Sequence, residues 1–295
     1  MKYRFIKQYS SCHRVQKMCQ VLKVSRSGYY QWLKRKISQR TQANETMLEE
    51  IKKIHSDPYM ENYGSPRMTA ELIDRGFLCS EPRVARIMKK NNIKSKIKLK
   101  YKVTTNSDHK KRRSPNLLQQ NFMVNAPNKV WVSDLTFIWT IEGWLYLTTV
   151  LDLFHRKVVG WAMSNRMFSD VTTEAALKQA FKREHPPMDL IIHSDPGVQY
   201  AADGFRGDLS EYGMIQSMSG KGNCYDNAVA ESFFKTIKTE LIYKTKYRTR
   251  KDARKAIFHY IEYFYNRKRK HSYLGNLSPE QFLMKYLKKA NHIAA

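Results

Sequence analysis

The sequence predicts an α/β protein in which one layered domain lies between two helical, basic flanks. Strand-like runs rich in β-branched and aromatic residues alternate with helical patterns between residues 129 and 219. Charge separates the same regions: residues 1–115 carry 28 Lys and Arg against 9 Asp and Glu, and residues 231–295 carry 16 against 5. Residues 116–230 carry only 9 against 12, so the basic flanks enclose a nearly neutral centre.

The overall composition is that of a folded protein that binds polyanions. With 295 residues, 42% of them hydrophobic, the chain has room for about two domains with real cores. No apolar run reaches the ~18 residues of a membrane span and no signal peptide is recognisable, so we expect no membrane contact and a cytoplasmic location.

The net charge of +27 favours nucleic acid as the partner. A ribosomal or chromatin-like protein without enzymatic activity would have the same charge.

The four cysteines predict neither disulfides nor a zinc site. They are scattered without a C-x-x-C pair, which is typical of reduced thiols in a cytoplasmic protein. Cys12, His13 and Cys19 lie close together in sequence, but no second pair at metal-ligand spacing follows them.

Helical patterns dominate the first third of the chain, over residues 14–22, 27–36, 66–74 and 83–93. Gly76 suits the end of the third helix, and Ser80 suits the N-cap of the fourth. Two short helices joined by a tight turn match a helix-turn-helix in outline, although any αα-hairpin has the same pattern. The charge favours the DNA-binding alternative, with Arg83 and Arg86 on the second helix as candidate contacts.

The central region predicts a mixed sheet with helices packed on it. An antiparallel meander is predicted over residues 129–140, 144–154 and 157–164, with a turn at Glu142-Gly143. The meander is followed by a helix from about residue 169 to 184, a strand over 189–195, a helix over 203–212 and a strand over 214–219. Ligand sites of such sheets lie at strand ends, which is where Asp195 falls.

Three carboxylates stand out by their surroundings. Asp134 interrupts the apolar run "WVSDLTFIW", Asp195 ends the fourth strand in "HSDPGVQY", and Glu231 lies in the helical run "NAVAESFFKTIKTEL". Carboxylates in apolar elements are costly unless they pair with cations or metal, and Mg²⁺ prefers such oxygen ligands. Each also has an ordinary explanation, as an edge-strand residue, a turn former beside Pro-Gly, or a partner of Lys235 at i+4.

The spacing of these residues and the surrounding motifs carry a family resemblance. Thirty-five residues lie between Asp195 and Glu231, and Lys238 follows seven residues later on the same helical face. With "YNRKRKHSYLGNLSPEQF" near the C-terminus and "YGSPRMTAELIDRGFLCSEPRVARIMKKNNI" upstream, the chain resembles the DDE transposases of bacterial insertion sequences. These are relatives of retroviral integrases, and the match is to the second-frame (OrfB-type) product of the IS-three family.

The resemblance implies an RNase H-like catalytic core, a mixed five-stranded sheet with flanking helices. An N-terminal all-α helix-turn-helix region and a C-terminal helical basic extension would complete the fold. Asp134, Asp195 and Glu231 would hold two Mg²⁺ (or Mn²⁺) ions that activate water for nicking and then the freed 3′-OH for joining. Lys238 would contact DNA near the scissile phosphate. Three further positions match the family and are assigned to DNA contact or site support: Asn227, Arg267 and His271. Lys235 is a further candidate DNA contact.

The chain departs from the family pattern beside Asp195. Relatives more often show "HSDRGSQY", whereas this chain has Pro196 and Val198. The replaced Arg is a potential phosphate contact, so the departure concerns local DNA contacts more than the carboxylate. His193 could be a general base, but the two-metal mechanism does not require one, and a structural role is favoured.

The predicted function is therefore Mg²⁺-dependent DNA cleavage and strand transfer. The alternatives are a non-catalytic DNA-binding regulator and an RNase H-like nuclease without strand transfer. Expected partners are the terminal inverted repeats of the element, target DNA, further copies of the chain, at least a dimer on DNA, and a possible first-frame fusion partner. The expected domains are residues 1–40 and 41–100 (helical and helix-turn-helix-like), 101–125 (basic linker), 126–242 (catalytic core) and 243–295 (basic helical region).

Overall fold

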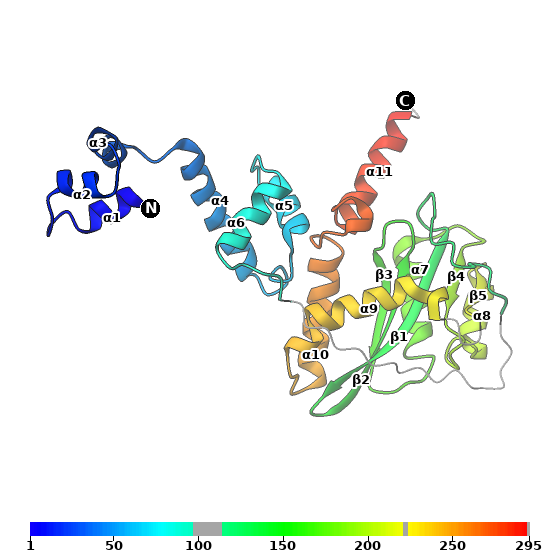
Figure 1. Cartoon of the computed structure of the whole chain (residues 1–295). Coiled ribbons are helices and arrows are strands. Elements are labelled where there is room, and N and C mark those ends of the chain that lie inside the picture. Colours follow the sequence, from blue (N-terminus) through cyan, green and yellow to red (C-terminus); the bar gives the residue numbers. More distant parts are fainter. Residues whose placement is uncertain (97–113, 221–223, 294–295) are drawn as a thin grey trace. The chain divides into compact units, whose positions relative to one another are not determined.

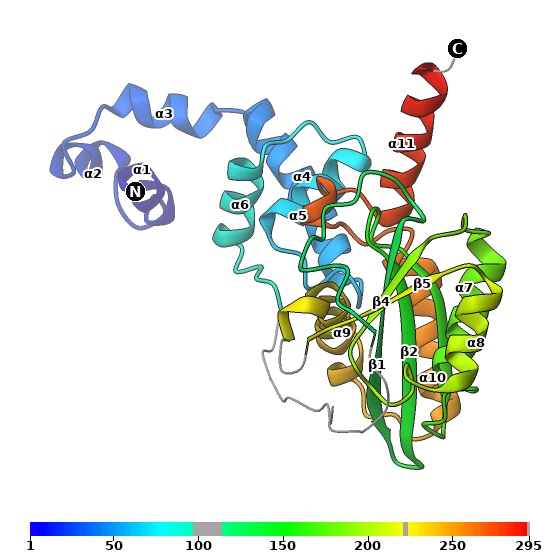
Figure 2. The same ribbon diagram turned by 90° about the vertical axis from the view of Figure 1, so that its right-hand side faces the viewer.

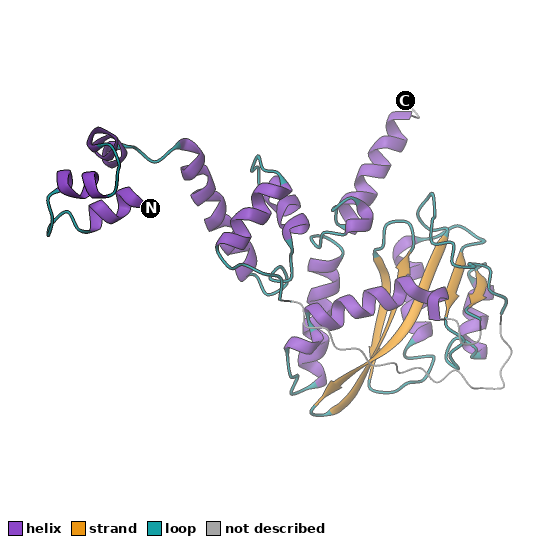
Figure 3. Ribbon diagram, viewed as in Figure 1, coloured by secondary structure: helices purple, strands orange, loops and turns teal. Residues whose placement is uncertain are grey.

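The computed structural model describes residues 1–96, 114–220 and 224–293 (Figure 1). Most of the expected basic linker and the start of "GNCYDN" lie outside these residues. The chain divides into two compact units, Met1–Glu50 and Ile51–Ala295. All strands among the described residues belong to one sheet in the second unit, and the other described elements are helical (Figure 3).

The first unit is a small helical cluster. Its helices are α1 (Lys2–Gln8), α2 (Val15–Val21), α3 (Arg26–Lys34) and the first part of α4 (Gln39–Ser56). Ile6, Met18, Cys19 and Tyr29 form its buried core. Cys19 is therefore a core side chain, and Ser25 caps α3 by accepting a hydrogen bond from the Gly28 N–H at 3.2 Å. The sequence patterns predicted α2 and α3 but missed α1 and α4.

A helical hairpin opens the second unit after the end of α4. Its helices are α5 (Ser65–Asp74) and α6 (Glu81–Lys90). Gly76 ends α5 with φ +86°, and the Phe77 N–H donates to the Leu72 carbonyl at 2.9 Å, so the glycine cap is confirmed. Ser80 takes the N-cap position of α6 with an extended backbone, but its side chain makes no capping hydrogen bond.

The sheet has five strands in the order β3-β2-β1-β4-β5, as the mixed-sheet prediction required. The strands are β1 (Val130–Thr140), β2 (Gly143–Asp152), β3 (Val158–Ser164), β4 (Ile191–Ser194) and β5 (Ile215–Met218). The first three are antiparallel, whereas β4 pairs parallel to both β1 and β5. The connections into the parallel strands β4 and β5 each contain a helix, and these two helices cover one face of the sheet.

Helices α7 (Thr173–Glu184) and α8 (Asp203–Glu211) cover one face, and α9 (Ala228–Glu240) crosses the other (Figure 2). Trp131, Leu177, Ile192 and Phe205 are among the side chains of the core beneath α7 and α8. After α9, the chain continues through α10 (Arg250–His259), the π-helix η3 (Tyr260–Tyr265) and α11 (Pro279–Ile293). Short 3₁₀ turns lie at Cys224–Asn227, Ile242–Lys244 and Ser272–Leu274.

Two predicted boundaries differ from the structure. The β1–β2 turn is Ile141-Glu142, because Thr140 pairs with Gly143, which is already the first residue of β2. Helix α7 begins four residues later than the pattern at Ser169 suggested. The Ser169 carbonyl instead accepts the N–H groups of Thr172 and Glu174 in a turn before the helix.

Helix α4 runs across residue 40, where the sequence pattern placed a domain boundary.

Within the described parts of the chain, no helix is both long enough and apolar enough to cross a membrane.

Gly160 of β3 lets α7 approach the sheet. A Cβ atom there would lie 2.4 Å from the Ala176 carbonyl oxygen and 2.6 Å from the Ala180 Cβ. Because the obstacle includes backbone, we expect Gly160→Ala to lower the free energy of unfolding by about 1–3 kcal/mol. Urea denaturation of the full chain measures this loss.

Gly207→Ala in α8 is the matched control, because a Cβ there meets nothing within 4 Å. It should leave stability unchanged or raise it by up to about 1 kcal/mol. Equal effects of the two substitutions would contradict the packing described for α7.

Candidate functional site

The parallel register of β1 and β4 brings Asp134 and Asp195 together. Ser133 of β1 pairs with Ser194, the last residue of β4, and the next residue of each chain segment is a carboxylate: Asp134 within β1 and Asp195 just after β4. Asp134 accepts a hydrogen bond from the Leu135 N–H at 2.7 Å, and both aspartates are half-buried. The structure thus places two of the three predicted carboxylates side by side.

The backbone after β4 turns around the Asp195 side chain. The Gly197 N–H donates to Asp195 Oδ1 at 3.1 Å, and a Cβ on Gly197 would lie 2.9 Å from that oxygen. A larger residue at position 197 would therefore displace the Asp195 carboxylate. Pro196 is buried, whereas Val198 is exposed beside the site.

Electrostatics tie Asp134, Asp195 and Glu231 into one group. Burial raises the pKa of Asp134 well above its ordinary value, and the negative charges of Asp195 and Glu231 raise it further. The pKa of Glu231, an exposed residue of α9, is also raised, first by partial desolvation and then by Asp195. Like charges held together in this way favour binding of a cation among them.

Lys238 supplies positive charge to the same group. Burial lowers the pKa of its ammonium group, and Asp134 opposes that shift. Lys238 in turn lowers the pKa of Asp134. Lys238, seven residues after Glu231 in α9, therefore brings a cation to Asp134.

Tyr200 lies beneath the carboxylates and was not singled out from the sequence. Its hydroxyl is 2.9 Å from the Ser133 Oγ, and its side chain is fully buried. Burial, Asp134 and Asp195 together raise the pKa of Tyr200 well above 10.0, so it stays protonated. The "HSDPGVQY" run contained it, but only the folded structure shows that it supports β1.

Oxygen donors of this kind suit Mg²⁺, although the carboxylates form no closed cage. No cluster of three Asp, Glu, His or Cys side chains in the described ranges is tight enough to enclose a metal ion. Mg²⁺ keeps several waters and usually takes only one or two protein carboxylates, so an open pair such as Asp134 and Asp195 fits its chemistry.

The chain is similar to known proteins over most of its length. Residues 124–224 and 231–287 match two family models described as Integrase core domain, and residues 42–101 match an HTH-like domain. Transposase InsF for insertion sequence IS3A of Escherichia coli (strain K12) is 39% identical over 97% of this chain and 100% of its own length. The chain belongs to the insertion-element transposase family.

Other relatives are similar over most of the chain. The insertion element IS600 uncharacterized 31 kDa protein of Shigella sonnei is 45% identical over 91% of this chain and 98% of its own. Among solved structures, the HTLV-2 integrase catalytic core domain in complex with magnesium matches 53% of this chain and 97% of that chain, with 18% identity and a TM-score of 0.40. A simian T-cell lymphotropic virus intasome matches with 15% identity and a TM-score of 0.45, over 79% of this chain and 74% of that chain.

The remaining predicted DNA contacts of this transposase-family chain fall into two groups. Lys235, Arg86 and Arg267 are exposed, and Arg83 is half-buried beside the Leu78 carbonyl. Asn227 and His271 are buried, and their hydrogen bonds lie within the protein.

The inward contacts of this buried pair support packing. The Asn227 amide donates to the Ser133 carbonyl at 3.2 Å, next to Asp134, and the His271 ring packs edge-on against Tyr265 at 4.8 Å. A DNA contact for these two residues stays a prediction, and the conformation described favours site support.

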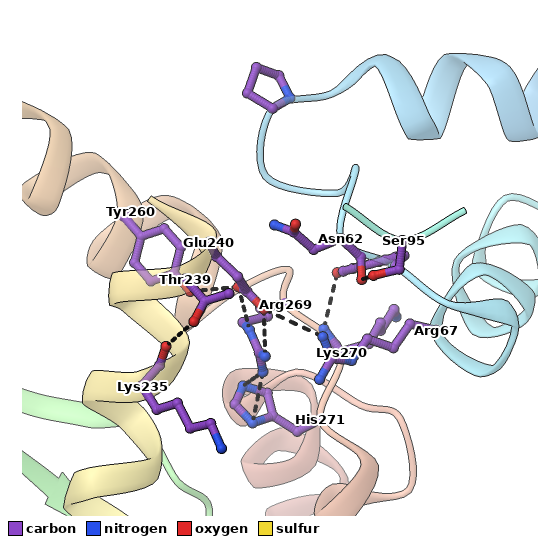
Figure 4. A network of polar contacts seen from close by, with 12 residues as sticks. Asn62, Arg67, Ser95, Lys235, Thr239, Glu240, Tyr260, Arg269, Lys270 and His271 are labelled. Atoms are coloured by element: carbon purple, nitrogen blue, oxygen red, sulfur yellow. Dashed lines mark hydrogen bonds and ion pairs between the residues drawn. The ribbon is translucent and has the colours of Figure 1, made fainter. Parts of the chain in front are cut away.

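Sequence patterns missed a buried polar network around Glu240, the last residue of α9 (Figure 4). Arg269, Tyr260 and Arg67 all donate to its carboxylate. The helical pattern did contain a signal, because Glu240 falls on the buried stripe formed by Phe233 and Ile237. Its partners could not be read from the sequence, because they lie far along the chain.

His193 is held by β5 rather than by the carboxylates. Its Nδ1 lies 2.8 Å from the Ser217 Oγ and its Nε2 lies 3.2 Å from the Ser219 Oγ. Burial lowers the pKa of His193 to about 4, so the ring is neutral at pH 7. These contacts support the structural role favoured for this residue.

This lowered pKa predicts a loss of stability in acid. Below pH 6.5 this histidine binds a proton in the unfolded chain, whereas in the folded protein it stays neutral down to about pH 4. The free energy of unfolding therefore falls as the pH is lowered from 6.5 to about 4. This histidine contributes about 3 kcal/mol to the pH dependence of the free energy of unfolding. Urea unfolding at several pH values should show a shallower pH dependence for His193→Asn than for the wild type. His13→Asn, at an exposed position, is the control and should keep the wild-type slope; equal slopes for all three proteins would contradict the assignment.

Proposed function

We propose that this chain is a Mg²⁺-dependent DDE polynucleotidyl transferase. It cleaves DNA at the ends of its insertion sequence and joins the freed 3′-OH to target DNA. The observation that supports this most directly is that Asp134 and Asp195 directly follow the paired residues Ser133 and Ser194. Burial raises the pKa of Asp134, and the charges of Asp195 and of Glu231 in α9 raise it further. A cluster of repelling carboxylates serves cation binding better than it serves folding.

In this proposal Asp134, Asp195 and Glu231 hold two Mg²⁺ (or Mn²⁺) ions. When bound, the ions would supply activation of the attacking oxygen and neutralise charge on the leaving oxygen. Asp134 presents its oxygens from within β1 and Asp195 from the residue after β4, whereas Glu231 is exposed on α9 and can adapt to the ligand. Lys238 places its ammonium group where it can bind a phosphate next to Asp134.

Duplex DNA would bind the basic flanks. Helix α6 exposes Arg86, Lys89 and Lys90, and Arg83 lies at its start. We assign residues 41–100 to recognition of the terminal inverted repeats, residues 126–242 to catalysis, and residues 243–295 to further DNA contact. In this assignment residues 1–40 are the N-terminal helical region and residues 101–125 the basic linker.

Two DNA ends must be joined, so we expect at least a dimer on DNA, and a first-frame product as a possible fusion partner. Such a protein would act in the bacterial cytoplasm at the nucleoid.

Asp195→Asn should abolish both nicking and joining. The substitution keeps the size of the side chain but removes one of the charges that hold the ions, so we expect activity to fall by at least about 10³-fold. The assay incubates full-length protein, Mg²⁺ and DNA carrying the element's ends, and resolves nicked and joined strands on denaturing gels.

Asp203→Asn, at the start of α8, is the matched control and should stay active. A variant at position 195 that nicks and joins like wild type would contradict the catalytic assignment and favour a DNA-binding regulator. Wild-type nicking without any product that depends on a 3′-OH would favour a nuclease.

A further inference from the structure

Glu240 is a buried carboxylate whose two oxygens are both occupied. Arg269 donates from Nη2 to Oε1 and from Nε to Oε2, each at 2.8 Å, and the Tyr260 hydroxyl donates to Oε2 at 2.7 Å (Figure 4). The side chains of Glu240 and Arg269 are each only 6% exposed. A two-pronged contact of this kind fixes the orientation as well as the distance of its partners.

The charges of this pair persist inside the protein. Burial alone would raise the pKa of Glu240, but Arg269 and the hydrogen bonds lower it below the ordinary value of 4.5. Glu240 correspondingly raises the pKa of Arg269 against the effect of burial. Removing one member leaves a buried charge without its partner, which is strongly destabilising.

Helix α9 is thereby anchored at both ends. At its N-cap, Asn227 donates to the Ser133 carbonyl, immediately before Asp134 in β1. At its last residue, Glu240 binds Arg269. Glu231 lies between the anchors, nine residues and about 13 Å from Glu240 along the helix. Because a helix is stiff, two end anchors fix its rotation and therefore the direction in which Glu231 projects.

The second anchor also includes the HTH-like segment. Arg67 of α5 places Nη1 3.4 Å from Glu240 Oε1. Lys270, the neighbour of Arg269, is buried and pairs with Asp74 at the end of α5. The same carboxylate at the end of α9 therefore receives contacts from the C-terminal segment and from α5.

We propose that Glu240 is a positioning residue for the metal site. Through Arg269 it sets the rotation of α9, so that Glu231 faces Asp134 and Asp195, and through Arg67 the HTH-like segment shares this anchor. Glu240 does not touch the reacting atoms. This inference rests on the proposed function, because it concerns the same carboxylates.

The test is Mn²⁺ binding to the full chain without DNA, followed by the electron paramagnetic resonance of free Mn²⁺. Glu240→Gln keeps the shape of the side chain but removes its charge. We expect the apparent Kd for Mn²⁺ to rise about 10- to 100-fold, as with other residues that orient metal ligands. Arg67→Met, which keeps the Glu240–Arg269 pair, should fold normally and raise the Kd about 2- to 5-fold.

Leu209→Ala is the matched control for lost stability. Leu209 is a buried residue of α8 in the core on the opposite face of the sheet, and it belongs to neither anchor. It should lower the Tm by an amount comparable to Glu240→Gln while the Kd for Mn²⁺ stays at the wild-type value. If Glu240→Gln loses stability but binds Mn²⁺ as wild type does, Glu240 is only structural. If Glu240→Gln does not fold, an unchanged Kd in Arg67→Met overturns the proposal.

Asp134→Asn separates this inference from the proposed function. The variant should lose Mn²⁺ binding at the site whether or not Glu240 positions α9. If it binds Mn²⁺ as wild type does, the proposed metal site itself is wrong. If it loses binding while Glu240→Gln and Arg67→Met do not, only the positioning role is wrong.

Discussion

The register between β1 and β4 is the constraint on which the site depends. Parallel pairing of Ser133 with Ser194 brings Asp134 and Asp195 close together, although 60 residues lie between them in the chain. Burial raises the pKa of Asp134, and repulsion by Asp195 raises it further. Hydrogen bonding within the sheet therefore stabilises an arrangement that the side chains oppose, a cost that is typical of functional sites.

The surroundings limit this repulsion without removing it. Lys238 opposes the negative charge, and backbone N–H groups bond to each aspartate. Glu231, in contrast, stays exposed on α9 and adds to the repulsion. The arrangement thus keeps negative charge available for a cation, while the anchors at the two ends of α9 hold the third carboxylate near the other two.

Much of this could be predicted from the sequence because the signals are local. Asp134 interrupts an apolar strand, Asp195 precedes Pro-Gly, and the β-branched and aromatic runs predicted all five strands of the sheet. The Glu240 network could not be predicted, because Arg269 lies 29 residues away and Arg67 lies 173 residues away. Buried ion pairs depend on long-range packing, and a glutamate at the end of a helix gives only a weak signal. The buried positions of Asn227 and His271 were hidden for the same reason.

The most direct test of this account is the thermal stability of wild type and Asp134→Asn, with and without Mg²⁺. In metal-free buffer at pH 7 the variant should have the higher Tm, because it lacks a half-buried carboxylate that its neighbours repel. Mg²⁺ should raise the Tm of wild type by about 2–4 °C for each kcal/mol of binding free energy, and leave the variant unchanged. The account would be contradicted by a variant that has a lower Tm than wild type without metal, together with a wild-type Tm that does not change when Mg²⁺ is added.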